Sequence, residues 1–314
     1  FDFTNGFHDS ANIVATSIAS RSLKPEVALS ISAVAEFIGA YFLGTAVAET
    51  IGKGIVNPSH LATGDIGIIV IVSALLGAIL WNLITWYFGM PSSSSHALIG
   101  GLIGAFVFGW GRSYVNWNKV GGVVLVMVAS PFVGLVVTYI FTRLTLVFSR
   151  WASPKANEVF RKLQIISSIT QAIAHGTNDA QKTMGVITFS LIILGLHTIP
   201  EGQAMVVPHW VVIICALVIS AGIVTGGLRI IKTLGYGLYQ IRPIHGFASQ
   251  AASTIIIYFT AFFGYPVSTT QVISSSVMGA GAAFRPKMIR WYVVQDMALA
   301  WLVTIPATAL MSGF

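Results

Sequence analysis

The chain has 314 residues, of which 55% are hydrophobic and only 9% carry a formal charge. Soluble globular proteins carry charge on about a quarter of their residues, so this composition excludes a soluble fold. The formal net charge of +7 comes from basic residues between apolar segments, without the interleaved aromatics of a nucleic-acid platform. We therefore expect an all-α polytopic protein of the cell membrane with no nucleic-acid partner.

Ten apolar stretches of helical length follow along the chain in two groups of five. The first group covers residues 7–20, 26–51, 65–88, 97–110 and 120–142, and the second covers residues 165–197, 209–231, 244–263, 271–284 and 291–311. The hydrophilic stretch 143–162 separates them. We predict a first repeat over residues 1–148, a cytoplasmic linker over 149–163 and a second repeat over 164–314. We also expect the first helix to begin upstream of Phe1.

The two halves share sequence. Residues 5–12 (Asn-Gly-Phe-His-Asp-Ser-Ala-Asn) align with residues 175–182 (His-Gly-Thr-Asn-Asp-Ala-Gln-Lys), 170 positions later. Residues 89–96 (Gly-Met-Pro-Ser-Ser-Ser-Ser-His) align with residues 264–271 (Gly-Tyr-Pro-Val-Ser-Thr-Thr-Gln), 175 positions later. Because both pairs occupy the same place in their halves, the chain is predicted to be an internal duplication.

Basic residues indicate the orientation of the two copies. By the positive-inside rule, the loops rich in Lys and Arg face the cytoplasm. These loops hold Arg21, Lys24, the basic residues of 143–162, Arg229, Lys232, Arg242, Arg285, Lys287 and Arg290. Counting crossings gives an odd number for the first half. The second copy is therefore predicted to be inverted, as in secondary transporters.

Each half has a Pro-Ser/Thr turn between its third and fourth segments. No charged residue lies between Asp65 and Arg112, so we predict that each turn enters the membrane as the tip of a re-entrant hairpin. Residues 65–88 are also long enough to span fully, which leaves a broken helix as the alternative.

The prolines of the two tips, Pro91 and Pro266, end one helix, and the hydroxyl residues after them are good N-caps for the next. Two inverted helix N-termini at the membrane midplane would favour a small oxyanion. Close packing of Ser and Thr between membrane helices is the alternative. The hydroxyl donors are Ser93, Ser94, Ser95, Ser268, Thr269 and Thr270.

Asp9 and Asp179 are matched acids on otherwise apolar segments. A buried carboxylate needs a cation or a proton, and nearby oxygens of Asn12, Thr177 and Asn178 suit a hard cation such as sodium. The alternatives are a helix-capping aspartate, or an aspartate paired with Lys182 or His8.

Two further charged residues lie inside apolar segments. Lys182 stands where the first copy has Asn12, and it either contacts the anion or neutralises Asp179 from one turn away. Glu36 is either a cation or proton site or the acceptor of a structural hydrogen bond. Its counterpart in the second half is predicted to be Ser220.

Gln250 is a candidate carbonyl ligand for sodium on the second hairpin, whereas His96 and His175 are expected to be hydrogen-bonded interior histidines. Ser95 and His96 are adjacent and point about 100° apart on a helix, so we do not expect an enzyme that uses them as nucleophile and base. The single cysteine, Cys215, excludes a disulfide. No cofactor is expected.

The motifs at residues 6–12 and 176–182 resemble the Gly-Ala-Asn-Asp-type signature of the inorganic phosphate transporter (PiT) family, and both hydroxyl tips match positions of that family. The resemblance covers essentially the whole chain. It implies phosphate uptake coupled to sodium or protons, inverted repeats with re-entrant hairpins, and commonly a homodimer. His8 and Lys182 stand where other members have Asn, and Ser220 where some have a second Glu. These departures leave proton coupling, metal phosphate and sulfate open.

Together these arguments predict a sodium-coupled phosphate symporter; the alternative is a proton-coupled phosphate, metal-phosphate or sulfate permease of the same architecture. The residues assigned to phosphate are Asn12, Ser93, Ser94, Ser95, Thr177, Asn178, Lys182, Ser268, Thr269 and Thr270. The residues assigned to sodium are Asp9, Asn12, Glu36, Asn178, Asp179 and Gln250.

Overall fold

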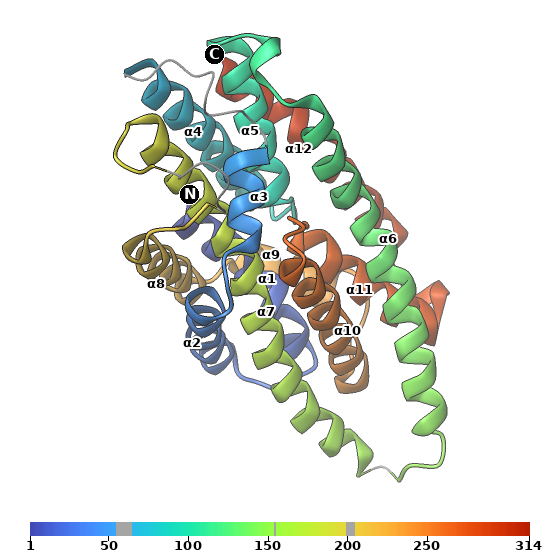
Figure 1. The fold of residues 1–314 in the computed structure, drawn as a ribbon. Coiled ribbons are helices and arrows are strands. Elements are labelled where there is room, and N and C mark those ends of the chain that lie inside the picture. Colours follow the sequence, from blue (N-terminus) through green and yellow to red (C-terminus); the bar gives the residue numbers. More distant parts are fainter. Residues whose placement is uncertain (55–64, 154, 199–204) are drawn as a thin grey trace.

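A computed structural model of the chain describes residues 1–54, 65–153, 155–198 and 205–314, and every regular element in these ranges is helical (Figure 1). The first half holds α1 (Asp2–Ala19), α2 (Pro25–Phe42), α3 (Ala46–Gly54), α4 (Asp65–Tyr87), α5 (Ser94–Gly109), the short turn η2 (Arg112–Tyr114) and α6 (Trp117–Phe148). The second half holds α7 (Ala156–Ile193), α8 (His209–Thr225), α9 (Leu228–Lys232), the π-helical turn η3 (Thr233–Gly237), α10 (Pro243–Phe262), α11 (Thr269–Phe284), η4 (Pro286–Met288) and α12 (Trp291–Gly313).

Two of the predicted segments are broken. The stretch 26–51 forms α2 and α3, with Gly44 between them at a φ of 96°. The stretch 209–231 ends its first helix at Gly226, whose φ is 65°, and the chain then bends by 61° into α9 and η3. Glycine adopts these left-handed conformations without the steric penalty of a side chain, so both breaks fall at glycine. An apolar run that continues across such a glycine conceals the break.

Only part of the hydrophilic stretch between the two halves forms a loop. Helix α6 continues to Phe148, and α7 begins at Ala156, so the last part of the stretch 149–163 is helical. Pro154 lies outside the described residues. The boundaries of the two repeats and of the linker stay predictions.

The two halves interlock through equivalent helices. Helix α1 packs against α8 and α2 against α7, while α5 packs against α12 and α11 against α6 (Figure 1). Glycines permit the closest approaches: a Cβ at Gly6 would lie 2.1 Å from the carbonyl oxygen of Ile219, and one at Gly176 would lie 2.3 Å from that of Glu36. Equivalent contacts in both directions are the property of two inverted repeats that exchange partners across a pseudo-two-fold axis.

Four helices of the described residues are long and apolar enough to cross a membrane, or five when the bent pair α8 and α9–η3 is counted as one span. The four cover residues 25–42, 67–87, 117–148 and 291–313. Helices α1 and α7 carry many polar side chains, and these are buried inside the bundle. These two helices are less apolar than the four spans because they line an interior polar region, where polar groups in membrane proteins gather.

Candidate functional site

The two hydroxyl tips meet at the centre of the bundle. Ser93 caps α5, since its Oγ accepts from the backbone N–H of His96 at 3.1 Å. Ser268 caps α11 in the same way, accepting from the N–H of Gln271 at 3.3 Å. The hydroxyl of Ser268 also donates to Ser93 Oγ at 2.7 Å. The predicted N-caps are therefore present, and the starts of two helices from opposite halves are in direct contact.

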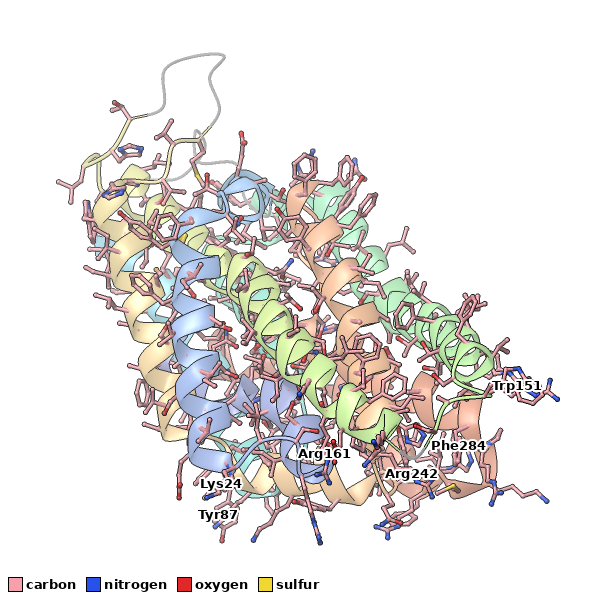
Figure 2. All side chains as sticks on the ribbon, turned by 90° about the horizontal axis from the view of Figure 1, so that it is seen from below. Lys24, Tyr87, Trp151, Arg161, Arg242 and Phe284 are labelled. Carbon is pink, nitrogen blue, oxygen red and sulfur yellow. The ribbon has the colours of Figure 1, made fainter. Side chains whose placement is uncertain are left out.

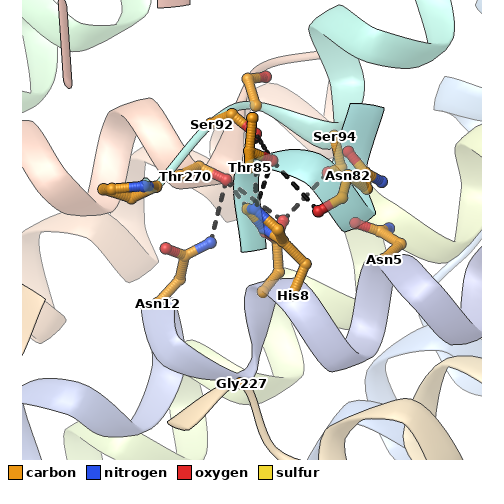
Figure 3. A network of polar contacts seen from close by, with 12 residues as sticks. Asn5, His8, Asn12, Asn82, Thr85, Ser92, Ser94, Gly227 and Thr270 are labelled. Atoms are coloured by element: carbon orange, nitrogen blue, oxygen red, sulfur yellow. Dashed lines mark hydrogen bonds and ion pairs between the residues drawn. The ribbon is translucent and has the colours of Figure 1, made fainter. Parts of the chain in front are cut away.

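The two aspartates lie at these helix starts, and neither is exposed to solvent. Ser94, at the start of α5, donates to Asp9 Oδ2 at 3.1 Å, and Thr269, at the start of α11, donates to Asp179 at 3.1 Å. Ser94 and Thr269 occupy equivalent positions of the two tips. Each copy thus holds its own aspartate against its own tip by the same hydrogen bond, and in the first copy Ser94 faces α1 (Figure 3).

A second pair of equivalent contacts crosses between the copies. Asn12 of the first copy donates from Nδ2 to Thr270 Oγ1 of the second at 3.0 Å, as Figure 3 shows. Lys182 of the second copy donates from Nζ to Ser95 Oγ of the first at 2.5 Å. The four tip residues at the helix starts are therefore all joined to the two signature motifs. The predicted site residues of the two halves therefore form one cluster, which we call the central cluster.

His175 bridges the acids of the cluster. Its Nε2 lies 3.7 Å from Asp9 Oδ2 and 3.5 Å from Asp179 Oδ2, while its Nδ1 lies 2.8 Å from Glu36 Oε1. Ligand atoms of His175 and the two aspartates all lie within 4.8 Å of one another, so the group has the spacing of a cation site. The expectation of an ordinary interior histidine understated this residue, which contacts three acids.

Both pairings raised as alternatives for the aspartates occur. Lys182 Nζ donates to Asp179 Oδ1 at 2.5 Å, and His8 Nδ1 lies 2.8 Å from Asp9 Oδ1. Among the described residues, Lys182 supplies the ammonium of the cluster, which also holds the three buried carboxylates of Asp9, Asp179 and Glu36. With neutral histidines the cluster carries an excess of negative charge, and a buried excess of this kind requires cations or protons.

Several oxygens of the cluster have no donor. Within the described part of the chain, the side-chain oxygens Asn5 Oδ1, Asn12 Oδ1, Asn178 Oδ1 and Glu36 Oε2 are buried without a hydrogen-bond partner. The side-chain nitrogen and oxygen of Asn82, on α4 beside Ser94 (Figure 3), are also buried without a hydrogen-bond partner among the described residues. Buried polar atoms without partners are rare and cost free energy, so they indicate where a bound species satisfies them.

Two predicted ligands point elsewhere. Thr177 donates its hydroxyl to the carbonyl oxygen of Ile173 at 2.8 Å. Gln250 accepts from Ser167 at 3.0 Å and donates to Ser17 Oγ at 3.0 Å, so its amide is already engaged outside the cluster. The assignments of both to the site stay predictions.

The predicted counterpart of Glu36 is wrong by one position. The carbonyl of Glu36 faces Gly176, and the equivalent carbonyl facing Gly6 belongs to Ile219. Ser220, the predicted counterpart, bonds to the carbonyl of Ala216 within its own helix. The second copy therefore places an apolar side chain where the first has an acid.

Asn5 and Asn82 were not singled out from the sequence. Asn5 Nδ2 lies 3.4 Å from Asp179 Oδ2, which mirrors the contact of His175 with Asp9. The signal for Asn5 was its alignment with His175, and the signal for Asn82 was a lone amide in the apolar run 65–88.

Comparisons with known proteins give a consistent result. A model described as "Phosphate transporter family" matches residues 5–312. A "Probable low-affinity inorganic phosphate transporter" of Bacillus subtilis is 43% identical over 314 residues, which is 100% of this chain and 92% of that protein. Proteins with the same description in Mycobacterium bovis and Rhizobium meliloti are 46% and 40% identical, covering 100% of this chain and 74% and 91% of theirs.

Among solved structures, "The sodium-dependent phosphate transporter" superposes with a TM-score of 0.87, covering 99% of this chain and 94% of that chain. Its sequence identity is 23%, so this likeness shows the fold.

Proposed function

Because the chain belongs to the phosphate transporter family, a family of membrane transporters and not of enzymes, we propose that it imports inorganic phosphate by sodium symport. The anion is held by the starts of α5 and α11, and sodium ions bind at Asp9 and Asp179. The observation that carries this proposal is the contact between tips and acids: each helix start donates a hydroxyl to the aspartate of its own copy. No covalent chemistry is required.

The oxygens without donors support a hard cation at this place. Sodium takes oxygen ligands, as other hard cations do, and the unpartnered oxygens of Asn5, Asn12, Asn178 and Glu36 belong to the residues around the two aspartates. A sodium ion there satisfies these oxygens and lowers the excess of negative charge. No cofactor beyond the transported ions enters this account.

Shared hydrogen-bond donors provide the coupling. Ser94, Thr269 and Thr270 donate to the aspartates, at 3.1 to 3.3 Å. A phosphate at the helix starts needs these same donors, and its charge is repelled by a bare carboxylate at low dielectric. Sodium on the carboxylates removes the repulsion and frees the hydroxyls for phosphate. By linkage, each ligand raises the affinity for the other by the same factor.

We further propose three features of the transporter as a whole. The tips act as re-entrant hairpins, the linker and the basic loops face the cytoplasm, and the transporter is a homodimer. Phosphate is contacted by the tip hydroxyls, Asn12, Thr177, Asn178 and Lys182, while Gln250 supports the sodium site.

His175 favours a second candidate, proton-coupled transport. Its ring lies between Asp9, Asp179 and Glu36, so a proton on it replaces one positive charge of a sodium ion. Sodium, pH and sulfate are therefore varied separately during uptake of labelled phosphate into proteoliposomes. Sodium stimulation at constant pH supports the symport with sodium. Uptake driven by a pH gradient without sodium supports the second candidate, and competition by sulfate identifies a broader oxyanion specificity.

The variant Asp179→Asn tests the cation assignment. We expect it to abolish sodium-stimulated phosphate uptake while the protein still folds, since the amide keeps the shape and one acceptor for Lys182. Removing this buried charge also leaves the ammonium of Lys182 unpaired at the cation site, so the double variant Asp179→Asn/Lys182→Asn, which removes the ammonium as well, should recover part of the uptake. Undiminished sodium-stimulated uptake in Asp179→Asn contradicts the proposal.

A further inference from the structure

A separate cavity of about 820 Å³ lies at the end of the bundle where the basic side chains gather. Figure 2 shows Lys24, Arg161 and Arg242 at this end. The wall is formed by the end of α1 and the two residues after it, by η3 and the loop that follows it, by the start of α10, by Asn157 near the start of α7, and by Arg290 just before α12. Segments from both halves of the chain thus enclose it.

Three arginines line this cavity, namely Arg21, Arg242 and Arg290. None of its lining residues is acidic, and none of the three arginines forms an ion pair in the part of the chain that the structure describes. Asn157 and Gln240 add amide donors. Guanidinium groups donate in a planar fork that matches the oxygens of a phosphate, so the lining has the chemistry of an oxyanion site.

The backbone of Arg21 and the hydrogen bonds of Arg290 both indicate that these side chains are available to bind an anion. Arg21 has a φ of 59°, in the left-handed region that residues other than glycine, asparagine and aspartate rarely adopt. Glycine would adopt this backbone conformation at a lower cost than arginine. The presence of arginine therefore indicates a role for its guanidinium group. Arg290 donates to the carbonyl of Tyr236 at 3.1 Å and keeps donors to spare, since a guanidinium has five N–H groups.

A stripe of polar residues on α1 runs from the central cluster to this cavity. Asn12 and Thr16 are four residues apart and therefore lie on one face of α1, and Ser20, four residues further, directly follows the last residue of the helix. Asn12 contacts the second tip, and Ser20 lines the cavity. Thr16 lies between them, buried, with a hydroxyl that has no partner within the described residues.

An apolar layer closes the route in this structure. Tyr239 lines the cavity and also belongs to the buried cluster that contains Ile18 and Met278. Its hydroxyl donates to the carbonyl oxygen of Val277 on α11 at 3.1 Å. Helix α11 begins at the tip of the central site, so Tyr239 joins the floor of the cavity to the helix that holds the anion.

We propose that this arginine-lined cavity is a second phosphate site, the vestibule through which the transported anion is released to the cytoplasm. The inference rests on the proposed function for the nature of the anion and on the positive-inside rule for the side. The three positive charges attract phosphate once the layer at Tyr239 opens, and the exposure of their side chains allows the anion to leave.

A reporter cysteine tests the cavity. In a Cys215→Ser background, Gln240→Cys places a thiol on its wall and Ser153→Cys places one at the same end outside it; both positions are exposed. Inside-out vesicles of phosphatidylcholine receive membrane-impermeant thiosulfonates that carry a sulfonate or a trimethylammonium group. At residue 240 we expect the sulfonate to react at least about tenfold faster than the cation, because a cleft of one charge raises association rates by this factor or more.

Inorganic phosphate should slow the reaction at residue 240 and not at residue 153. Arg21→Gln should lower the charge preference, because it removes one of the three positive charges, and Arg21→Lys should keep it. Arg21→Gln should also raise, about fivefold, the internal phosphate concentration that half-inhibits uptake, leaving the external KM unchanged. Equal rates for the two reagents, absence of phosphate protection, or reaction only in right-side-out vesicles overturns the vestibule.

Vesicles with added phosphatidylglycerol distinguish a lipid headgroup from free phosphate. Protection by phosphatidylglycerol alone, without protection by inorganic phosphate, assigns the site to lipid and overturns the proposal. Sodium-driven uptake of the same protein is measured in right-side-out vesicles. Absence of uptake there contradicts the proposed function, whereas normal uptake with equal labelling rates contradicts the vestibule alone.

Discussion

The surroundings of Asp9 and Asp179 differ although their sequences derive from one duplicated motif. Each aspartate accepts a hydroxyl from its own tip, Asp9 from Ser94 and Asp179 from Thr269. Their charged partners have diverged: Asp179 has the ammonium of Lys182 at 2.5 Å, whereas the basic side chains next to Asp9 are the histidines His8 and His175.

The same divergence extends to the acids and amides around them. Asn5 in the first copy corresponds to His175 in the second, and Glu36 corresponds to Ile219. The duplication thus preserved the tips and the carboxylates, which contact the anion and the cations in our proposal. It did not preserve the groups that set the charge. We infer that the first copy depends on an external cation and that Lys182 supplies part of that charge in the second.

The strongest test compares the loss of each acid. Asp9→Asn should lower sodium-stimulated uptake by about 100-fold, because breaking a buried charged arrangement costs about 3 kcal/mol or more. The double variant Asp179→Asn/Lys182→Asn removes a carboxylate together with its own cation and should lose only about tenfold. The measurement is the initial rate of labelled phosphate uptake in proteoliposomes. Equal losses for the two proteins would show that the copies are not different in this way.

Restoring the amide in the second copy sharpens the comparison. Lys182→Asn recreates the arrangement of Asn12 and leaves Asp179 without its ammonium, so an additional sodium ion should be needed. Uptake should depend more steeply on sodium, and the half-saturating concentration should change by about tenfold, within the range usual for coupled sites. An unchanged sodium dependence in Lys182→Asn would contradict a charge role for the lysine.

The histidine that bridges the acids is expected to carry the pH dependence. His175→Asn gives the second copy the residue that the first has at Asn5 and removes the one titratable nitrogen pair between the three acids. The variation of uptake between pH 6 and 8 should decrease by about threefold, because histidine is the side chain that ordinarily titrates there. His96→Gln, which copies the equivalent Gln271, is the matched control and should keep the dependence. A flat profile in the control but not in His175→Asn would reverse the assignment.

Most residues of the central cluster could be predicted from the sequence because they lie in four short motifs. The two motifs and the two tips are short, and the duplication fixes which residues correspond. Contacts across the interface were not accessible in this way: the meeting of Glu36 with His175 depends on how closely α2 approaches α7 at Gly176. The break after α2 was also hidden, because residues 43–45 (Leu-Gly-Thr) carry no charge and interrupt the hydrophobic stretch only weakly.

The smallest effect concerns the caps of the two tips. Ser93 Oγ accepts from the backbone N–H of His96, lies 2.7 Å from the His96 ring and accepts from Ser268, whereas the cap role of Ser268 rests on a single bond to the N–H of Gln271. Loss of an N-cap costs about 1 kcal/mol, so Ser268→Ala should lower the thermal midpoint of the purified protein by about 2 °C.

Ser93→Ala also leaves the ring of His96 and the hydroxyl of Ser268 without a partner, so its midpoint should fall about twice as far as that of Ser268→Ala. Ser153→Ala, on the exposed loop between α6 and α7, should leave the midpoint unchanged. A larger decrease for Ser268→Ala than for Ser93→Ala would contradict this prediction. It would show that the contact between the two helix starts depends more on the second tip than on the first.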